Sequence, residues 1–97
     1  MEQWTFLTNH AHVLLCIARD PDIRLKDIAA HVGITERATQ RILADLRREG
    51  YVTPVRVGRR NHYEVERDLA LRHPLENDCS LGALLDALEY PLHRAKV

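Results

Sequence analysis

The sequence predicts a small, mostly α-helical α+β domain: a core of three helices, one β-hairpin and a further helix near the C-terminal end. Two short helical patterns, LKDIAAHV and ERATQRILADLRREG, are separated only by Gly33, Ile34 and Thr35. A run rich in β-branched residues, YVTPVRV, follows them and leads through a glycine turn to HYEV. The 97 residues are the length of one domain.

The first helix is expected to begin near Thr8 or Asn9, because either residue is a favourable N-cap. Apolar residues then recur at helical spacing and give this helix one buried face: Val13, Leu14, Ile17 and Ala18. The sequence Asp20-Pro21-Asp22 is expected to end the helix. Proline cannot continue the backbone hydrogen bonds, and it biases the residue before it away from helical geometry.

The second helix is expected over Leu25–Val32. Its apolar residues stand at i, i+3, i+4 and i+7, which places them on one face: Leu25, Ile28, Ala29 and Val32. Gly33 follows at the position where a helix C-terminus favours a left-handed residue. Thr35 then caps the third helix, and Gly50 ends it.

The third helix has a dry face and a basic face when its residues are placed at about 100° intervals. The core face carries Thr39, Ile42, Leu43 and Leu46. The opposite face carries Arg37, Arg41, Ala44 and Arg48, with Gln40 and Arg47 beside them. A small residue therefore lies at the centre of a basic surface.

The hairpin is expected to run out along Tyr51–Val57 and back along His62–Val65, with a turn at Gly58-Arg59-Arg60-Asn61. Pro54 restricts the first strand to an edge or a bulge. Residues 66–79 read as irregular. A last helix, capped by Asp78 or Ser80 and ended by Pro91, carries an apolar stripe of leucines. We therefore divide the chain into residues 1–65 and a linker and C-terminal helix over 66–97.

Charge is concentrated although the net charge is zero. Residues 35–62 hold seven Arg and three acids, a balance of +4, whereas residues 66–97 hold four bases and six acids, a balance of −2. Local charge sets a binding footprint more than the total does.

No apolar run approaches the roughly 20 residues that span a bilayer. The acidic start lacks the basic region of a signal peptide, and two Cys make no secreted disulfide framework. We expect a cytoplasmic protein with no membrane partner.

The order of elements, with the GIT…L…REGYV…GRRNHYEV stretch, resembles the winged helix-turn-helix domains of bacterial MarR-type and ArsR-type regulators. The resemblance covers about residues 10–65. It implies a homodimeric, sequence-specific transcriptional regulator, a repressor, that binds inverted half-sites on double-stranded DNA. The alternative is a winged-helix module that binds another protein. Salt dependence discriminates between them, because binding to phosphates weakens steeply with ionic strength.

Such a domain places the third helix, about residues 35–49, in the major groove and the wing, about residues 51–65, on the flanking backbone or minor groove. Arg forks onto guanine and Gln pairs with adenine, so base reading is expected from Arg37, Gln40 and Arg41. Each of the three has phosphate contact as its alternative. Glu36 either accepts a hydrogen bond from cytosine or is a first-turn acid that the helix dipole stabilises. Phosphate contacts are expected from Thr35, Arg47, Arg48, Arg59 and Arg60, although Arg47 and Arg48 have Glu49 as an alternative partner.

The apolar stripe of the last helix either folds back on its own domain or packs across a two-fold axis. The resemblance favours the second arrangement, with the large apolar residues of the N-terminal segment as neighbours. The expected dimerisation residues are Trp4, Phe6, Leu81, Leu84, Leu85 and Leu88.

Six His and two Cys raise the alternative of a metal sensor, as in some ArsR-type relatives. The sequence has no CxxC or HxxxH pair, and a site would need ligands gathered across a dimer, such as His12, Cys16, His73 or Cys79. The alternative to metal binding for Cys16 is that it is a small buried hydrophobic residue. A redox role for either Cys stays open. We expect no metal and no cofactor.

We also expect no enzymatic activity, because the sequence has no glycine-rich phosphate loop, no GxSxG motif and no carboxylate pair with a companion His.

Overall fold

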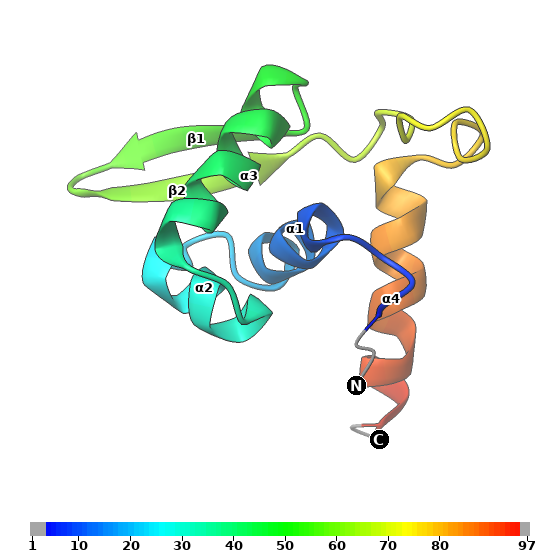
Figure 1. Ribbon diagram of the computed structural model, residues 1–97, viewed down its shortest axis with the longest axis horizontal. Helices are drawn as coiled ribbons and strands as arrows, with labels where there is room; N and C mark the ends of the chain where they lie inside the picture. The colour runs from blue at the N-terminus through cyan, green and yellow to red at the C-terminus, as the bar shows by residue number, and fades with distance from the viewer. Residues whose placement is uncertain (1–3, 96–97) are drawn as a thin grey trace. The chain divides into compact units, whose positions relative to one another are not determined.

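The computed structural model describes residues 4–95 and contains four helices and one hairpin in this range. The helices are α1 (Asn9–Arg19), α2 (Leu25–Val32), α3 (Glu36–Arg48) and α4 (Leu81–Ala95), and the strands are β1 (Val52–Val57) and β2 (Arg60–Val65). The chain divides into two compact units, residues 1–65 and residues 66–97. The first unit holds α1 to β2 and the second holds α4 (Figure 1). The predicted mostly helical α+β fold is confirmed.

The core of the first unit is built from all three helices and the hairpin. Its buried residues are Val13, Leu14 and Ile17 of α1, Ile28 and Ala29 of α2, Thr39, Ile42, Leu43 and Leu46 of α3, and Tyr51, Val52 and Tyr63. Thr39 is fully buried, and its hydroxyl donates to the carbonyl of Thr35 at 2.9 Å. The dry face predicted for the third helix is therefore confirmed, and its one polar member is satisfied.

The connection between α2 and α3 has the geometry that the sequence indicates. Gly33 adopts φ 85° and ψ 34°, a left-handed conformation that an L side chain rarely adopts. Its N–H donates to the carbonyl of Ala29 at 2.8 Å. Thr35 then caps α3, since its Oγ1 accepts from the N–H of Ala38 at 3.0 Å. These two residues fix the direction in which α3 leaves the turn.

The hairpin turn is shorter than the sequence indicates. Val57 pairs with Arg60, so only Gly58 and Arg59 form the loop, and the prediction that Arg60 and Asn61 belong to the turn is wrong. Gly58 has φ 62°, whereas no non-glycine residue of the described range has positive φ. A two-residue loop with positive φ at its first position matches the right-handed twist of the strands, and glycine supplies it. Arg60 consequently belongs to β2 rather than to the loop.

The second unit begins with a loop that folds over the start of α4. The N–H of Leu81 donates to the carbonyl of Leu69, and that of Gly82 to the carbonyl of Arg67, both at 2.8 Å. Ser80 caps the helix by accepting from the N–H of Ala83 at 3.1 Å. A Cβ on Gly82 would lie 3.1 Å from the Cβ of Arg67, so this close approach favours glycine.

The end of α4 differs from the prediction. The helix continues through Pro91 to Ala95, so the expectation that Pro91 ends it is wrong. Proline removes one backbone hydrogen bond and strains the preceding turn, and near the end of a helix few further bonds depend on that turn. Within the described residues, no helix combines the length and hydropathy that crossing a membrane requires.

Candidate nucleic-acid interface

The outer face of α3 is a basic surface. Glu36, Arg37, Gln40, Arg41, Ala44, Arg47 and Arg48 are all exposed, and the opposite face is buried in the core. The Arg residues lie on a helix that is capped at its start and packed along its length. The backbone that presents them is therefore rigid. We call the exposed residues of α3 the basic face.

The start of the basic face combines a cap with long donors. Because the Thr35 hydroxyl accepts from Ala38, its own proton remains able to donate to a phosphate. Arg37 and Arg41 stand one turn apart, with Gln40 beside them. A guanidinium reaches two acceptors at once and a carboxamide offers one donor and one acceptor, which are the requirements for reading base edges.

The far end of the basic face is partly occupied by internal contacts. The Nη2 of Arg48 donates to Asp45 Oδ1 at 2.7 Å, and its Nε lies 3.7 Å from Glu49 Oε2. Ala44, Arg47 and Arg48 line a shallow hollow on this part of α3. Arg48 therefore has carboxylate partners. The sequence indicated Glu49 as the alternative to a phosphate, whereas the shorter contact is to Asp45.

Asp45 also connects α3 to α1. His10 Nε2 lies 2.9 Å from Asp45 Oδ2, across 35 residues of sequence. The hydrogen bond from His10, followed by that from Arg48, holds the pKa of Asp45 below its usual range. The same contact with Asp45 raises the pKa of Arg48. Nothing in the helical pattern indicated His10 as a partner, because the sequence does not show which helix faces the side of α3.

The Asp45 cluster predicts a specific pH dependence of stability. A carboxyl whose pKa is lower in the folded than in the unfolded chain stabilises the fold above its unfolded pKa. The stabilisation is lost as pH falls through the folded pKa, which lies below the usual pKa of an aspartate carboxyl. Asp45→Asn should therefore lower the urea midpoint at pH 6 and lose that effect toward pH 3. Glu64→Gln, at an exposed carboxyl of β2, is the matched control. An Asp45→Asn effect of constant size from pH 6 to pH 3 would contradict the assignment.

The wing is tied to the turn between α1 and α2. The N–H of Tyr63 donates to the carbonyl of Pro21 at 2.8 Å. Arg60 Nη2 donates to the carbonyl of Asp22 at 2.8 Å, and His62 Nδ1 lies 2.7 Å from Asp22 Oδ1. Three contacts across about forty residues of sequence thus hold β2 against this turn. Sequence patterns did not indicate Asp22 or His62 as partners, because no spacing rule connects positions this far apart.

The two arginines of the predicted wing tip have different surroundings. Arg59 occupies the exposed second position of the loop, whereas Arg60 lies in β2 with its guanidinium on Asp22. A guanidinium has five N–H donors, so one bond to Asp22 leaves donors for a phosphate. Arg56, on β1, donates from Nε to the carbonyl of Gly58 at 3.1 Å.

The residues predicted to form a dimer also differ in exposure. Trp4 and Phe6 are 69% and 92% exposed, and their rings meet edge to face with centroids 5.1 Å apart. Leu81 and Leu85 are buried within the chain, and Leu84 and Leu88 are half-buried. The aromatic pair and the two half-buried leucines are therefore the members with surface to offer a partner.

The described residues bring together no group of three or more His, Cys, Asp or Glu placed to hold a metal ion. Cys16 and Cys79 are both free thiols and half-buried, and they lie in different units.

Three comparisons with known proteins bear on this geometry. Residues 8–53 match a family model described as winged helix-turn-helix DNA-binding. Among solved structures, T. potens IscR matches with a TM-score of 0.64 and 18% sequence identity, over 91% of this chain and 90% of that chain. That likeness shows the fold. Comparison with curated proteins gave no match. The helices, turn and hairpin described above therefore have the winged helix-turn-helix fold, and residues 8–53 are similar to a DNA-binding family with that fold.

Proposed function

We propose that this protein is a sequence-specific transcriptional regulator, without catalytic activity of its own, that represses by binding operator DNA as a homodimer. The observation that carries the proposal is the exposed basic face of α3, presented by a capped and packed helix. In a helix-turn-helix, the second helix of the motif enters the major groove. The local charge of +4 over residues 35–62 favours the phosphate backbone even though the whole chain is neutral.

Roles within the interface follow from position and from existing contacts. Arg37, Gln40 and Arg41 lie near the start of α3, where we assign base reading. Thr35, Arg47 and the wing-tip Arg59 are assigned to phosphates. Glu36 is assigned to the helix dipole rather than to a base, since a first-turn acid is favourable there.

Arg48 and Arg60 are assigned to phosphates as residues held in place before DNA arrives. Arg48 is oriented by Asp45, and Arg60 by the carbonyl of Asp22. A donor that is already ordered loses less entropy when a phosphate binds. We therefore expect the Asp22 turn to position the wing.

Selection of bound fragments from random DNA, repeated at two salt concentrations, tests the proposed function. A recurrent inverted motif with half-sites about one helical turn apart would support a dimeric regulator. If the protein makes about six or more phosphate contacts, its affinity for DNA should fall by orders of magnitude between about 50 and 200 mM salt. Such a fall would support DNA as the partner. Enrichment of no motif, together with weak and salt-independent binding, would favour the alternative of a protein-binding module.

We predict that the wing holds the backbone and does not choose bases. Arg59→Ala combined with Arg60→Ala should weaken cognate and random DNA alike. It should also flatten the slope of log affinity against log salt by about one to two units, because each lost phosphate contact removes about 0.9. Fluorescence anisotropy at four salt concentrations measures the slope. A new preferred half-site with an unchanged slope would contradict the assignment.

A matched variant separates charge from position. Asp22→Ala retains both wing arginines but removes the carboxylate that contacts His62. We expect a smaller loss of affinity than in the double arginine variant and an unchanged salt slope, because no positive charge has been removed.

A further inference from the structure

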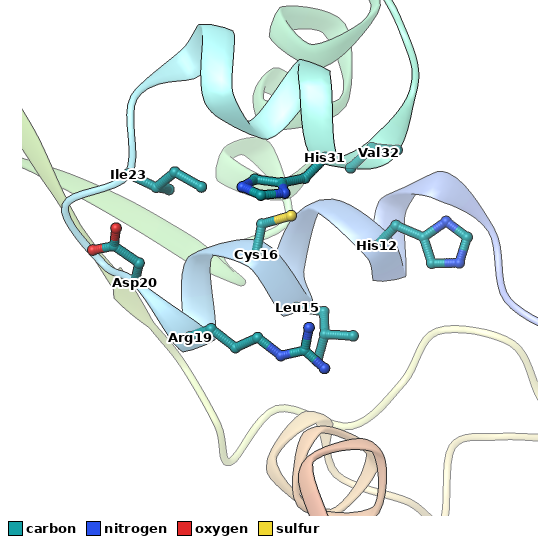
Figure 2. A pocket seen from close by; sticks show the side chains of 8 residues that line it. All are labelled: His12, Leu15, Cys16, Arg19, Asp20, Ile23, His31 and Val32. Atoms are coloured by element: carbon teal, nitrogen blue, oxygen red, sulfur yellow. The ribbon is translucent and has the colours of Figure 1, made fainter. Parts of the chain in front are cut away.

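The turn between α1 and α2 is ordered by hydrogen bonds of its own. The N–H of Ile23 donates to the carbonyl of Asp20 at 3.1 Å, and the N–H of Asp22 donates to Asp20 Oδ1 at the same distance. Figure 2 shows Asp20 and Ile23 at the two ends of this turn. The backbone of Asp22, which lies between them, is therefore held in place before DNA binds.

Asp22 contacts two residues of the wing through two different groups. Its carbonyl accepts from Arg60 Nη2, and its carboxylate oxygen Oδ1 lies 2.7 Å from His62 Nδ1. A ring nitrogen this close to a carboxylate oxygen carries a proton and donates it. The N–H of Tyr63, the next residue of β2, donates to the carbonyl of Pro21. The contact of His62 is therefore flanked in sequence by two other hydrogen bonds that attach β2 to the turn.

The charges around this pair leave its strength to the imidazole of His62. Four further charged residues lie within two positions of His62 or of Asp22 in the sequence: Asp20, Arg24, Arg60 and Glu64. They are two acids and two bases, so their charges balance. The cross-strand partner of His62 on β1 is Val55, which has no charge. Protonation of His62 is therefore the event near neutral pH that changes its attraction to the Asp22 carboxylate.

We propose that His62 is a positioning residue of the wing, and that protonation of its imidazole raises affinity for DNA. A charged imidazole donates a stronger hydrogen bond to a carboxylate than a neutral one does, and the two groups then also attract as an ion pair. Histidine is the side chain that changes charge between about pH 5 and 8. The contact is therefore stronger near pH 6, where both partners are charged, and is weakened as pH rises to 8.

The effect of His62 on DNA is transmitted through Arg60. Stronger attachment of β2 to the turn keeps the guanidinium of Arg60 ordered beside Asp22, and an ordered donor loses less entropy when a phosphate binds. The side chains of His62 and Asp22 are 40% and 62% exposed, so water screens the contact and the effect is modest. This DNA-binding half of the proposal rests on the proposed function, whereas the pH-dependent attachment of the wing does not.

Amide hydrogen exchange of the full-length chain without DNA tests the attachment. The reporter is the N–H of Tyr63, which donates to Pro21, and the reference is the N–H of Tyr51, which donates to the carbonyl of Leu46 where the chain leaves α3. After correction for base catalysis, we expect Tyr63 to be about two- to five-fold better protected at pH 6 than at pH 8, the range that an exposed ion pair supports. Tyr51 should be equally protected at both. Equal protection of Tyr63 at the two pH values would overturn the proposal.

Three substitutions separate the charge of the pair from its packing. His62→Gln and Asp22→Asn each keep a hydrogen-bonding side chain and remove one charge, so each should abolish the pH dependence of Tyr63 protection. His62→Lys retains a positive charge throughout and should keep Tyr63 as well protected at pH 8 as at pH 6. A pH dependence of Tyr63 that persists in His62→Gln would exclude His62 as its source.

Titrations of a selected operator at pH 6 and pH 8, at constant ionic strength, test the DNA-binding half. We expect the ratio of the two affinities to be about two- to five-fold larger in the parent chain than in His62→Gln. The control is His73→Gln, at an exposed imidazole of the second unit, which should behave as the parent. A ratio that is the same in the parent and in His62→Gln would remove the effect on DNA.

The salt dependence at pH 6 distinguishes a positioning residue from a phosphate contact. We expect the parent and His62→Gln to have the same slope of log affinity against log salt, because His62 acts through Arg60. A parent slope steeper by about 0.9 would make His62 itself a phosphate contact and overturn its positioning role. A chain whose Tyr63 protection depends on pH but that binds no DNA would defeat the proposed function alone.

Discussion

Arg41→Ala is expected to lower affinity for the selected operator by about 1–3 kcal/mol and to relax preference at one or two base pairs. The reason is geometric. Arg41 is exposed on the basic face, one turn from Arg37, on a helix whose opposite face is buried in the core. Truncation removes a bidentate contact to guanine. Affinity for sites with another base at that position falls less, because Arg41 contacts those bases less well. Anisotropy titrations on the operator and on each single-base-pair variant measure both quantities.

Arg37→Ala is expected to act in the same way at a neighbouring base pair. Arg72→Ala is the control, because this exposed arginine lies in the second unit and outside the basic face. Equal weakening on every sequence would reassign Arg37 and Arg41 to phosphates. Unchanged binding in both variants would remove α3 from the interface.

The double variant Trp4→Ser, Phe6→Ser is expected to sediment as a monomer at micromolar concentration and to bind the inverted operator on the order of 10²-fold more weakly. Both rings are largely exposed, so the substitution removes apolar surface from a prospective interface and little from the core. Two linked half-sites bind more tightly than one, because the second contact forms at a high effective concentration. Sedimentation velocity and operator titration report the two effects separately.

Leu75→Ser is the matched control for the aromatic pair. Leu75 is 90% exposed and lies in the loop before α4, so it tests whether loss of any exposed apolar side chain suffices. A parent chain that sediments as a monomer, or a double variant that remains dimeric, would exclude the aromatic pair from a dimer interface. In that case a single chain would have to account for the operator affinity.

Local patterns were enough to predict most of the winged helix-turn-helix. The bounds of α2, the left-handed Gly33 and the Thr35 cap depend on residues within one turn of each other, and sequence spacing records such neighbours directly. The two faces of α3 followed for the same reason, since its period of 3.6 residues separates apolar from basic positions. The roles assigned to the basic face in DNA binding stay predictions.

The contacts between distant segments were decided only by the tertiary structure. Asp22 with His62, and His10 with Asp45, join residues 35 to 40 positions apart, and no local rule selects one pairing over another. The length of the hairpin loop and the continuation of α4 through Pro91 were also misjudged from local signals. The sequence by itself determined which faces are dry and which are basic, because periodicity is a local property. Packing determined which charges remain available and which are held by a partner, because that depends on segments brought together only when the core closes.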